Sequence, residues 1–231
     1  VHAYSVAWSE KEIREVKDFA TKIIFNSISQ LLCYYPLIDD TPIGLRINPG
    51  VSHSDFDLAN PARRYSRLGV TDKKELEQVS HLLSGVMFHC NCDNDDFDSF
   101  ERILNHIAVN YGELLHKLEW VSLGGGIYFT KEGYPFDKFC DKLSEFSKRF
   151  NVQIYLEPGE TAITKSGYLV TKVLDIVQNE IDIAIVDSAV ETHMLDLCIY
   201  NLEAKMELPE GGKHRYMIAG RTCLAGDTFG T

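Results

Sequence analysis

Six short apolar runs alternate with amphipathic stretches over the first 165 residues, and this alternation limits the possible folds more than any other feature of the chain. A strand that is apolar throughout is buried on both faces, and a stretch with apolar residues every three or four positions supplies a covering helix. The pattern therefore predicts an α/β fold, with a parallel sheet covered by helices. The predicted strands lie within residues 1–6, 22–27, 43–50, 85–91, 120–126 and 152–159.

The stretches between these strands carry helix signals. In residues 9–21, Ser9 stands in the N-cap position and Glu12 completes a capping box ahead of apolar residues with helical spacing. Polar or glycine residues follow nearly every predicted strand, which is where α/β barrels keep their chemistry. Six β/α units can be counted and a closed barrel has eight, so we expect about two units to precede Val1. Further helices are predicted within residues 72–84, 95–118 and 135–150.

The pattern changes after residue 165. Residues 167–191 and 214–223 alternate or run as strands with no helical spacing between them, which predicts a mostly β second domain. We therefore expect an incomplete α/β barrel over residues 1–163 and an incomplete β domain over residues 164–231. The chain begins and ends in segments typical of a core, so it is expected to be part of a longer polypeptide.

The net charge of −11 argues against a nucleic-acid partner, because no basic stripe is present to neutralise phosphates, and it suits a small cationic substrate. No apolar run approaches the roughly 18 residues that indicate a membrane span, and no signal peptide is visible. We interpret the six scattered cysteines as reduced thiols of a cytoplasmic protein. Cys90 and Cys92 are close, but strand spacing would place them on opposite faces, and no metal site is predicted.

Three segments at strand ends mark the candidate site. Gly124, Gly125 and Gly126 expose backbone N–H groups that can hold a phosphate, although a tight turn would also explain them. Glu157 ends the following strand, where a partly desolvated carboxylate needs either a protonated ligand or a neighbouring arginine. His89 ends the strand two units earlier, and its ring either stacks on a planar ligand or packs in the core.

A fourth segment, residues 220–227, places Cys223 and Asp227 in a glycine-rich turn of the second domain, where a simple loop is the alternative. In this order, the four segments resemble the fold type III pyridoxal-phosphate decarboxylases, relatives of alanine racemase, ornithine decarboxylase and diaminopimelate decarboxylase. The segments "LRINP", "EPGET" and "TCLAGD" are similar to the carboxynorspermidine decarboxylases within that family. The resemblance covers essentially the whole chain, and it implies a (β/α)8-type barrel of the alanine racemase-like family followed by a β domain.

The resemblance implies pyridoxal 5′-phosphate as the cofactor and assigns residues to it. Glu157 would bind the pyridine nitrogen and keep it protonated, which makes the ring an electron sink. His89, counted with the catalytic residues, would stack on the ring face, and Gly125 and Gly126 would bind the phosphate. The implied reaction is decarboxylation of carboxynorspermidine or carboxyspermidine to norspermidine or spermidine, in polyamine biosynthesis.

The resemblance also implies a homodimer in which the two subunits share their active sites. Cys223 would reach into the site of the other subunit and return a proton to the carbon atom that has lost carbon dioxide. Asp227 would lie beside it, near the substrate. These two residues therefore join the predicted catalytic and substrate-binding groups.

One position departs from the family pattern. In ornithine and diaminopimelate decarboxylases an arginine that helps to hold the phosphate follows Glu-Pro-Gly, and here that position is Glu160. A carboxylate cannot hold a phosphate, but it can bind an ammonium group of a carboxylated polyamine, so Glu160 is predicted to bind substrate. Asp196 is predicted to supply another acidic contact. For both residues, a solvated surface acid is the alternative.

The reaction needs a lysine that holds the cofactor and is displaced by the substrate amine. None of the 14 lysines ends an apolar strand, so this lysine is expected upstream of Val1. Two alternatives remain open. One is decarboxylation of another basic amino acid such as diaminopimelate, against which Glu160 argues. The other is a non-catalytic relative that binds pyridoxal phosphate.

Overall fold

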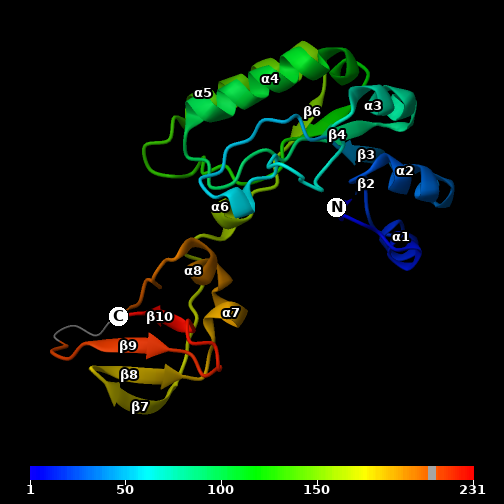
Figure 1. Ribbon diagram of the computed structural model, residues 1–231. Helices are drawn as coiled ribbons and strands as arrows, with labels where there is room; N and C mark the ends of the chain where they lie inside the picture. The colour runs from blue at the N-terminus through cyan, green and yellow to red at the C-terminus, as the bar shows by residue number, and fades with distance from the viewer. Residues whose placement is uncertain (208–211) are drawn as a thin grey trace. The chain divides into compact units, whose positions relative to one another are not determined.

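The computed structural model describes residues 1–207 and 212–231, which divide into two compact units, Val1–Thr164 and Lys165–Thr231 (Figure 1). The first unit contains a six-stranded sheet in which all pairings are parallel. All six predicted strands are present, so the prediction of an α/β fold with a parallel sheet is confirmed. The strands are β1 (His2–Tyr4), β2 (Lys22–Phe25), β3 (Ile43–Arg46), β4 (Gly85–Met87), β5 (Trp120–Ser122) and β6 (Gln153–Tyr155).

The order of the strands identifies the winding of this sheet. Each of the four inner strands pairs with the strand that precedes it and the strand that follows it in the sequence, and β1 and β6 lie at the edges. A doubly wound sheet reverses its strand order at a switch point, whereas an α/β barrel keeps the order of the sequence. The first unit is therefore a curled parallel half-barrel rather than a doubly wound sheet.

Helices connect the strands and cover one face of the sheet. The first helix has Ser9 as its N-cap and shows the predicted capping box. The Ser9 hydroxyl accepts the Glu12 N–H, and the Glu12 carboxylate accepts the Ser9 N–H. The three other predicted helices are also present, as α3, α4 and α5, and α4 packs beside α5 in Figure 1. The helices of this unit are α1 (Glu10–Val16), α2 (Ile28–Tyr34), α3 (Lys73–Val79), α4 (Phe97–Leu115), α5 (Phe136–Phe150) and α6 (Glu160–Ile163).

The two faces of the sheet differ in their packing. The face toward the helices holds most of the buried apolar side chains, and these alternate along each strand with residues of the opposite face. On the opposite face Trp120 packs with Ile24 and Met87 in a small second core. The indole lies directly against Gly44 and Gly85, where a Cβ atom would overlap its ring. These two glycines therefore make room for the largest side chain of this face.

The second unit contains a four-stranded sheet in the order β10-β9-β8-β7. The β8–β9 pair is parallel, and the two outer pairs are antiparallel. Two short helices separate β8 from β9, so the prediction of strands without helices between them is wrong. The elements of this unit are β7 (Val173–Asn179), β8 (Ile181–Val186), α7 (Val190–His193), α8 (Leu195–Tyr200), β9 (Tyr216–Ala219) and β10 (Thr228–Gly230).

The helix α7 begins without a local capping side chain. Its N-cap residue, Ala189, has no side chain that can accept a hydrogen bond. Instead, Asp227 Oδ1 accepts the Val190 N–H at 2.8 Å, across 37 positions of the chain. Val190 is fully buried in a small core with Val186 and Phe229.

Among the helices of the described residues, none is long and apolar enough to cross a membrane.

Candidate active site

A pocket of about 300 Å³ lies in the first unit at the carboxyl ends of its strands. Arg46 and Met87 end β3 and β4, and His89 and Glu157 lie two residues beyond the ends of β4 and β6. Residues two apart on a strand share a face, so these side chains converge on the same side of the sheet. Two larger hollows, of about 580 and 510 Å³, contain none of the predicted site residues. This pocket is therefore the candidate site because of the side chains that line it, and not because of its volume.

His89 forms one wall of the pocket as a neutral ring. Burial, with a smaller contribution from the charge of Arg46, lowers the pKa of the His89 imidazole to about 4. The N–H of Gly125 donates to Nδ1 at 3.2 Å, which leaves the ring proton on Nε2. A flat, neutral ring held from one edge can stack on a planar ligand, even on one with a positive charge.

Glu157 is held by the strand before it. The Ser122 hydroxyl donates to Glu157 Oε1 at 2.5 Å, and it also accepts the N–H of Gly124 at 3.2 Å. The Glu157 N–H donates to the Gly124 carbonyl at 2.8 Å, so the two turns lie against each other. Sequence reasoning missed Ser122, because a small polar residue in a strand gives no signal of its own. The result is a carboxylate with a fixed direction.

Arg46 is a buried cation in the same pocket, with only 6% of its surface exposed. Its guanidinium donates to the Tyr4 hydroxyl at 2.7 Å, and that hydroxyl donates to Asn26 Oδ1 at 2.8 Å. Among the described residues, the salt bridges include none between Arg46 and Glu157. Sequence reasoning missed Arg46, although a charged residue at the end of the apolar run "IGLR" was the available signal.

Each of the three glycines approaches the end of a neighbouring strand. The φ angles of Gly124 and Gly126 are +68° and +75°, in the region that favours glycine. A Cβ at Gly124 would overlap the His89 ring, and a Cβ at Gly126 would overlap the backbone that follows β4. A Cβ at Gly125 would overlap the carbonyl oxygen of Glu157. The turn thus joins three strand ends, while phosphate binding by Gly125 and Gly126 stays a prediction.

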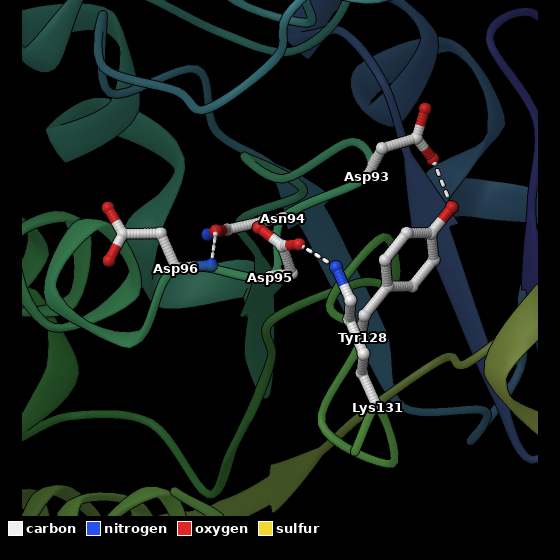
Figure 2. A network of polar contacts seen from close by, with 6 residues as sticks. All are labelled: Asp93, Asn94, Asp95, Asp96, Tyr128 and Lys131. Carbon is white, nitrogen blue, oxygen red and sulfur yellow. Dashed lines mark hydrogen bonds and ion pairs between the residues drawn. The ribbon is translucent and has the colours of Figure 1, made fainter. Parts of the chain in front are cut away.

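A further polar group lies beside the glycine turn (Figure 2). The Tyr128 hydroxyl oxygen is 2.7 Å from a carboxylate oxygen of Asp93 and 2.7 Å from one of Glu160. Lys131 pairs with Asp95 in the same region. Glu160 is exposed at the start of α6, and its predicted contact with substrate stays a prediction. Sequence reasoning missed Tyr128, which follows the glycines by two positions.

Three predicted residues lie in the second unit. Cys223 is exposed in the turn between β9 and β10, and Asp196 is exposed in the first turn of α8. Asp227 is buried, and its carboxylate accepts hydrogen bonds from Val190 and Thr222. Burial acts to raise the pKa of Asp227, but these hydrogen bonds outweigh it and the pKa is lowered. Asp227 thus has a structural role, and the predicted functional roles of all three residues stay predictions.

A parallel sheet wound in sequence order, with polar side chains around a pocket at the carboxyl ends of its strands, is the arrangement of α/β-barrel enzymes. A family model described as "Pyridoxal-dependent decarboxylase, C-terminal sheet domain" matches residues 31–231. The chain therefore belongs to the pyridoxal-dependent decarboxylases, and the resemblance seen in its sequence is confirmed.

Named relatives cover nearly all of the chain. It is 50% identical over 229 residues to a carboxynorspermidine/carboxyspermidine decarboxylase of Herminiimonas arsenicoxydans, covering 99% of this chain and 62% of the relative. It is 36% identical over 245 residues to a protein of the same name from Campylobacter jejuni, covering 100% of this chain and 64% of the relative. The chain thus spans less than two thirds of the length of these relatives.

One solved structure is similar in both sequence and fold. It is the crystal structure of carboxynorspermidine decarboxylase complexed with norspermidine from Campylobacter jejuni. The match has a TM-score of 0.81 and 34% sequence identity, and it covers 99% of this chain and 63% of that chain. Both units of the present chain therefore have counterparts in a single decarboxylase structure.

Proposed function

We propose that the complete protein is a pyridoxal-phosphate-dependent decarboxylase that converts carboxynorspermidine or carboxyspermidine to norspermidine or spermidine. The observation that carries the proposal is the similarity, at 50% identity along 99% of the chain, to a relative named for this reaction. The curled half-barrel would then be part of a (β/α)8 barrel. The lysine that the reaction needs stays a prediction, and no lysine is among the described residues that line the pocket.

The described pocket fits the proposed cofactor. The Glu157 carboxylate, held by Ser122, shares the pocket with the His89 ring. A carboxylate in this place would accept the N–H of a pyridine ring and keep its nitrogen protonated, while the neutral imidazole would stack on the ring face. When bound, pyridoxal phosphate supplies the electron sink that loss of a carboxyl group requires. Gly125 and Gly126 are proposed to bind the phosphate through their backbone, where no side chain obstructs it; the Gly126 N–H would be the donor, because the Gly125 N–H donates to His89 Nδ1.

Charge supports the choice of substrate. Glu160 stands where related decarboxylases with smaller substrates have an arginine, and it is proposed to bind an ammonium group of the polyamine chain. Diaminopimelate carries a second carboxylate at its far end, which Glu160 would repel. Asp196 is proposed as a further acidic contact, and the net charge of −11 would attract a cation from solution. Asp227 is proposed to lie near the substrate while its carboxylate holds Val190 and Thr222.

The proposal includes a homodimer with shared active sites. Cys223 lies exposed in a turn of the second unit, as a residue that reaches a partner subunit must. Its thiol is proposed to deliver a proton to the substrate carbon after carbon dioxide has left. His89 would meanwhile keep the cofactor ring in place without taking up a proton, because burial lowers its pKa to about 4 and its Nδ1 accepts the Gly125 N–H.

The test uses the complete protein with added pyridoxal phosphate. Release of carbon dioxide is measured from carboxynorspermidine, carboxyspermidine and diaminopimelate, beside an absorbance titration with the cofactor. We expect at least one carboxylated polyamine to exceed diaminopimelate in kcat/KM by about 100-fold or more. Faster turnover of diaminopimelate would overturn the proposed substrate. Cofactor binding without turnover of any of the three would instead identify a non-catalytic relative.

A further inference from the structure

Tyr128 stands between two carboxylates. Its hydroxyl oxygen lies 2.7 Å from Asp93 Oδ1 and 2.7 Å from Glu160 Oε2. Figure 2 shows the Asp93 carboxylate directed at this hydroxyl. A phenol has one hydrogen on its oxygen, so Tyr128 donates to only one of the two carboxylates at a time. The other carboxylate then receives no hydrogen bond from Tyr128, and the negative charges of Asp93 and Glu160 lie close to each other.

The backbone holds Tyr128 in a fixed place. The Asn94 N–H donates to the Gly126 carbonyl at 2.9 Å, and the Tyr128 N–H donates to the Asn94 carbonyl at 2.8 Å. The beginning of α6 is tied to the same segment by a separate bond, in which the Thr161 hydroxyl donates to the Ile127 carbonyl at 3.0 Å. The phenol therefore acts from a fixed position, and α6 keeps one attachment that does not depend on it.

The phenol stays protonated at ordinary pH. Burial raises the pKa of Tyr128, and its hydrogen bonds to Asp93 and Glu160, together with their charges, raise it further. A hydroxyl of this kind cannot serve as a base. Its available action is to donate one hydrogen bond, and the choice of acceptor lies between the two acids.

We propose that Tyr128 is a positioning residue for substrate specificity, which holds the Glu160 carboxylate where an ammonium group of a polyamine chain meets it. The inference rests on the proposed function and deepens it. When an ammonium group binds Glu160, its hydrogen bond adds to the one that the phenol donates there, and its positive charge offsets the second negative charge of the two acids. The pair of acids therefore accepts one additional cation without losing a hydrogen bond.

A purely structural role is the rival interpretation, in which the phenol only fastens α6 to the glycine turn. The two interpretations differ in how they depend on Glu160. A fastening contact affects stability, and its effect combines independently with changes elsewhere in the site. A positioning contact acts only through the Glu160 carboxylate, so its effect disappears once that carboxylate has been replaced.

The experiment compares four variants of the complete holoenzyme: Tyr128→Phe, Glu160→Gln, the double variant and Tyr134→Phe. Tyr134→Phe is the matched control, because the Tyr134 hydroxyl is buried without a hydrogen-bond partner in the described part of the chain. The readouts are kcat and KM for carboxynorspermidine, the Kd of norspermidine by calorimetry, the Kd of pyridoxal phosphate by absorbance, and the Tm.

We expect Tyr128→Phe to raise the KM and the norspermidine Kd by about 5- to 30-fold, with kcat changed by less than about threefold. Glu160→Gln should lower kcat/KM by about 10- to 100-fold while leaving the cofactor Kd unchanged. The double variant should be no worse than Glu160→Gln alone. Tyr134→Phe should match the wild type in KM and in both dissociation constants.

The outcomes separate the inference from the proposed function. A wild-type holoenzyme that neither decarboxylates carboxynorspermidine nor binds norspermidine would refute the proposed function itself. With an active wild type, an unchanged KM in Tyr128→Phe overturns the positioning role. A double variant in which the two single effects multiply also overturns the positioning role. The same holds if Tyr128→Phe lowers the Tm and leaves the substrate affinity unchanged, or if Tyr128→Phe does not fold.

Discussion

At the residue scale, the carboxylate of Glu157 owes its direction to the strand beside it. Ser122 donates to it at 2.5 Å, and the backbone of Gly124 accepts the Glu157 N–H at 2.8 Å. Gly124 also lies against His89, so one turn fixes both walls of the pocket. A carboxylate held in this way loses little conformational freedom when a ligand binds, which favours a strong interaction.

The variant Glu157→Gln tests the role of this carboxylate. We expect kcat of the complete enzyme to fall by about 100-fold or more, because a neutral amide cannot keep the pyridine nitrogen protonated and each pKa unit is worth about 1.4 kcal/mol. Glu119→Gln makes the same change on an exposed side chain just before β5, at the opposite end of the sheet, and should leave kcat within about twofold. A normal kcat in Glu157→Gln at saturating cofactor would refute the assignment.

The pKa of His89 predicts how stability depends on pH. In the folded protein, burial lowers this pKa to about 4, whereas an exposed imidazole has a pKa of about 6.5. Between these values the unfolded chain binds a proton that the folded chain does not, so stability falls as the pH drops from 6.5 towards 4. The loss is on the order of 3 kcal/mol.

Urea unfolding of the cofactor-free complete protein at pH 7, 5.5 and 4.5 measures this loss. In His89→Phe the contribution of the imidazole is removed, and the free energy of unfolding should decline less over the same range. The same decline in both proteins would mean that other groups cause it.

His89 and Glu157 could be predicted at the pocket because polar side chains at the ends of apolar strands are visible in a sequence, whereas Glu160 was predicted from the family resemblance and its role stays a prediction. Ser122 could not be predicted, since one small polar residue at the end of a strand is compatible with simple alternation, whereas Arg46, at the end of the apolar run "IGLR", carried a signal that was missed. Phosphate binding by Gly125 and Gly126 stays a prediction, and the contacts of the glycine turn with neighbouring strand ends were not predicted. Close contacts between distant backbone segments have no local sequence signal.

At the scale of elements, the half-barrel is held together by side chains that cross several strands. Trp120 extends from β5 over Gly85 in β4 and Gly44 in β3. The Trp120 indole N–H donates to the Ser84 hydroxyl at 3.0 Å, which fixes the ring in this position. The three strands thus depend on the absence of a side chain at two glycine positions.

The variant Gly85→Ala should destabilise the protein by about 1–3 kcal/mol, because the added methyl group would overlap the fixed indole. Gly112→Ala is the control. In α4 a Cβ at this position would lie 3.5 Å from the Phe150 ring, an ordinary contact, and alanine favours the helix by up to about 1 kcal/mol. Urea unfolding measures both. Equal stability of Gly85→Ala and the wild type would show that the sheet adjusts freely around Trp120.

Helices and strands whose own residues carry a sequence signal could be predicted. Those that depend on residues far away in the chain could not. The six parallel strands follow from apolar runs, and α1 follows from Ser9 and Glu12. The helix α7 was missed because Asp227, which caps it, lies 37 positions further along the chain. A helix of four residues also has too few turns to show a helical period.

At the scale of the whole molecule, the predicted site residues fall into two groups. His89, Glu157 and Glu160 belong to the first unit, and Cys223, Asp196 and Asp227 belong to the second. In the proposed dimer, Cys223 serves the pocket of the other subunit. A two-fold axis makes the two shared sites equivalent, so each subunit both gives a thiol and receives one.

Mixing the Glu157→Gln and Cys223→Ala variants of the complete enzyme tests this arrangement. In a mixed dimer, one of the two sites receives both residues intact, and random exchange makes about half of the dimers mixed, so we expect about a quarter of wild-type activity. Subunit exchange is verified by co-purification of differently tagged subunits. If exchange is complete and activity stays at the level of the separate variants, the sites are not shared.

The sequence order of the six strands also bears on how the chain folds while it is being made. Each strand that leaves the ribosome finds its partner in the strand just before it, so pairing does not wait for a distant segment. Paired residues of neighbouring strands lie 20 to 41 positions apart, so each pairing closes a shorter loop than a pairing that skips a strand would need. His89 emerges first and the glycine turn next, and β6 then docks on that turn. We therefore expect Glu157 to complete the pocket as the last step of sheet growth in this half-barrel.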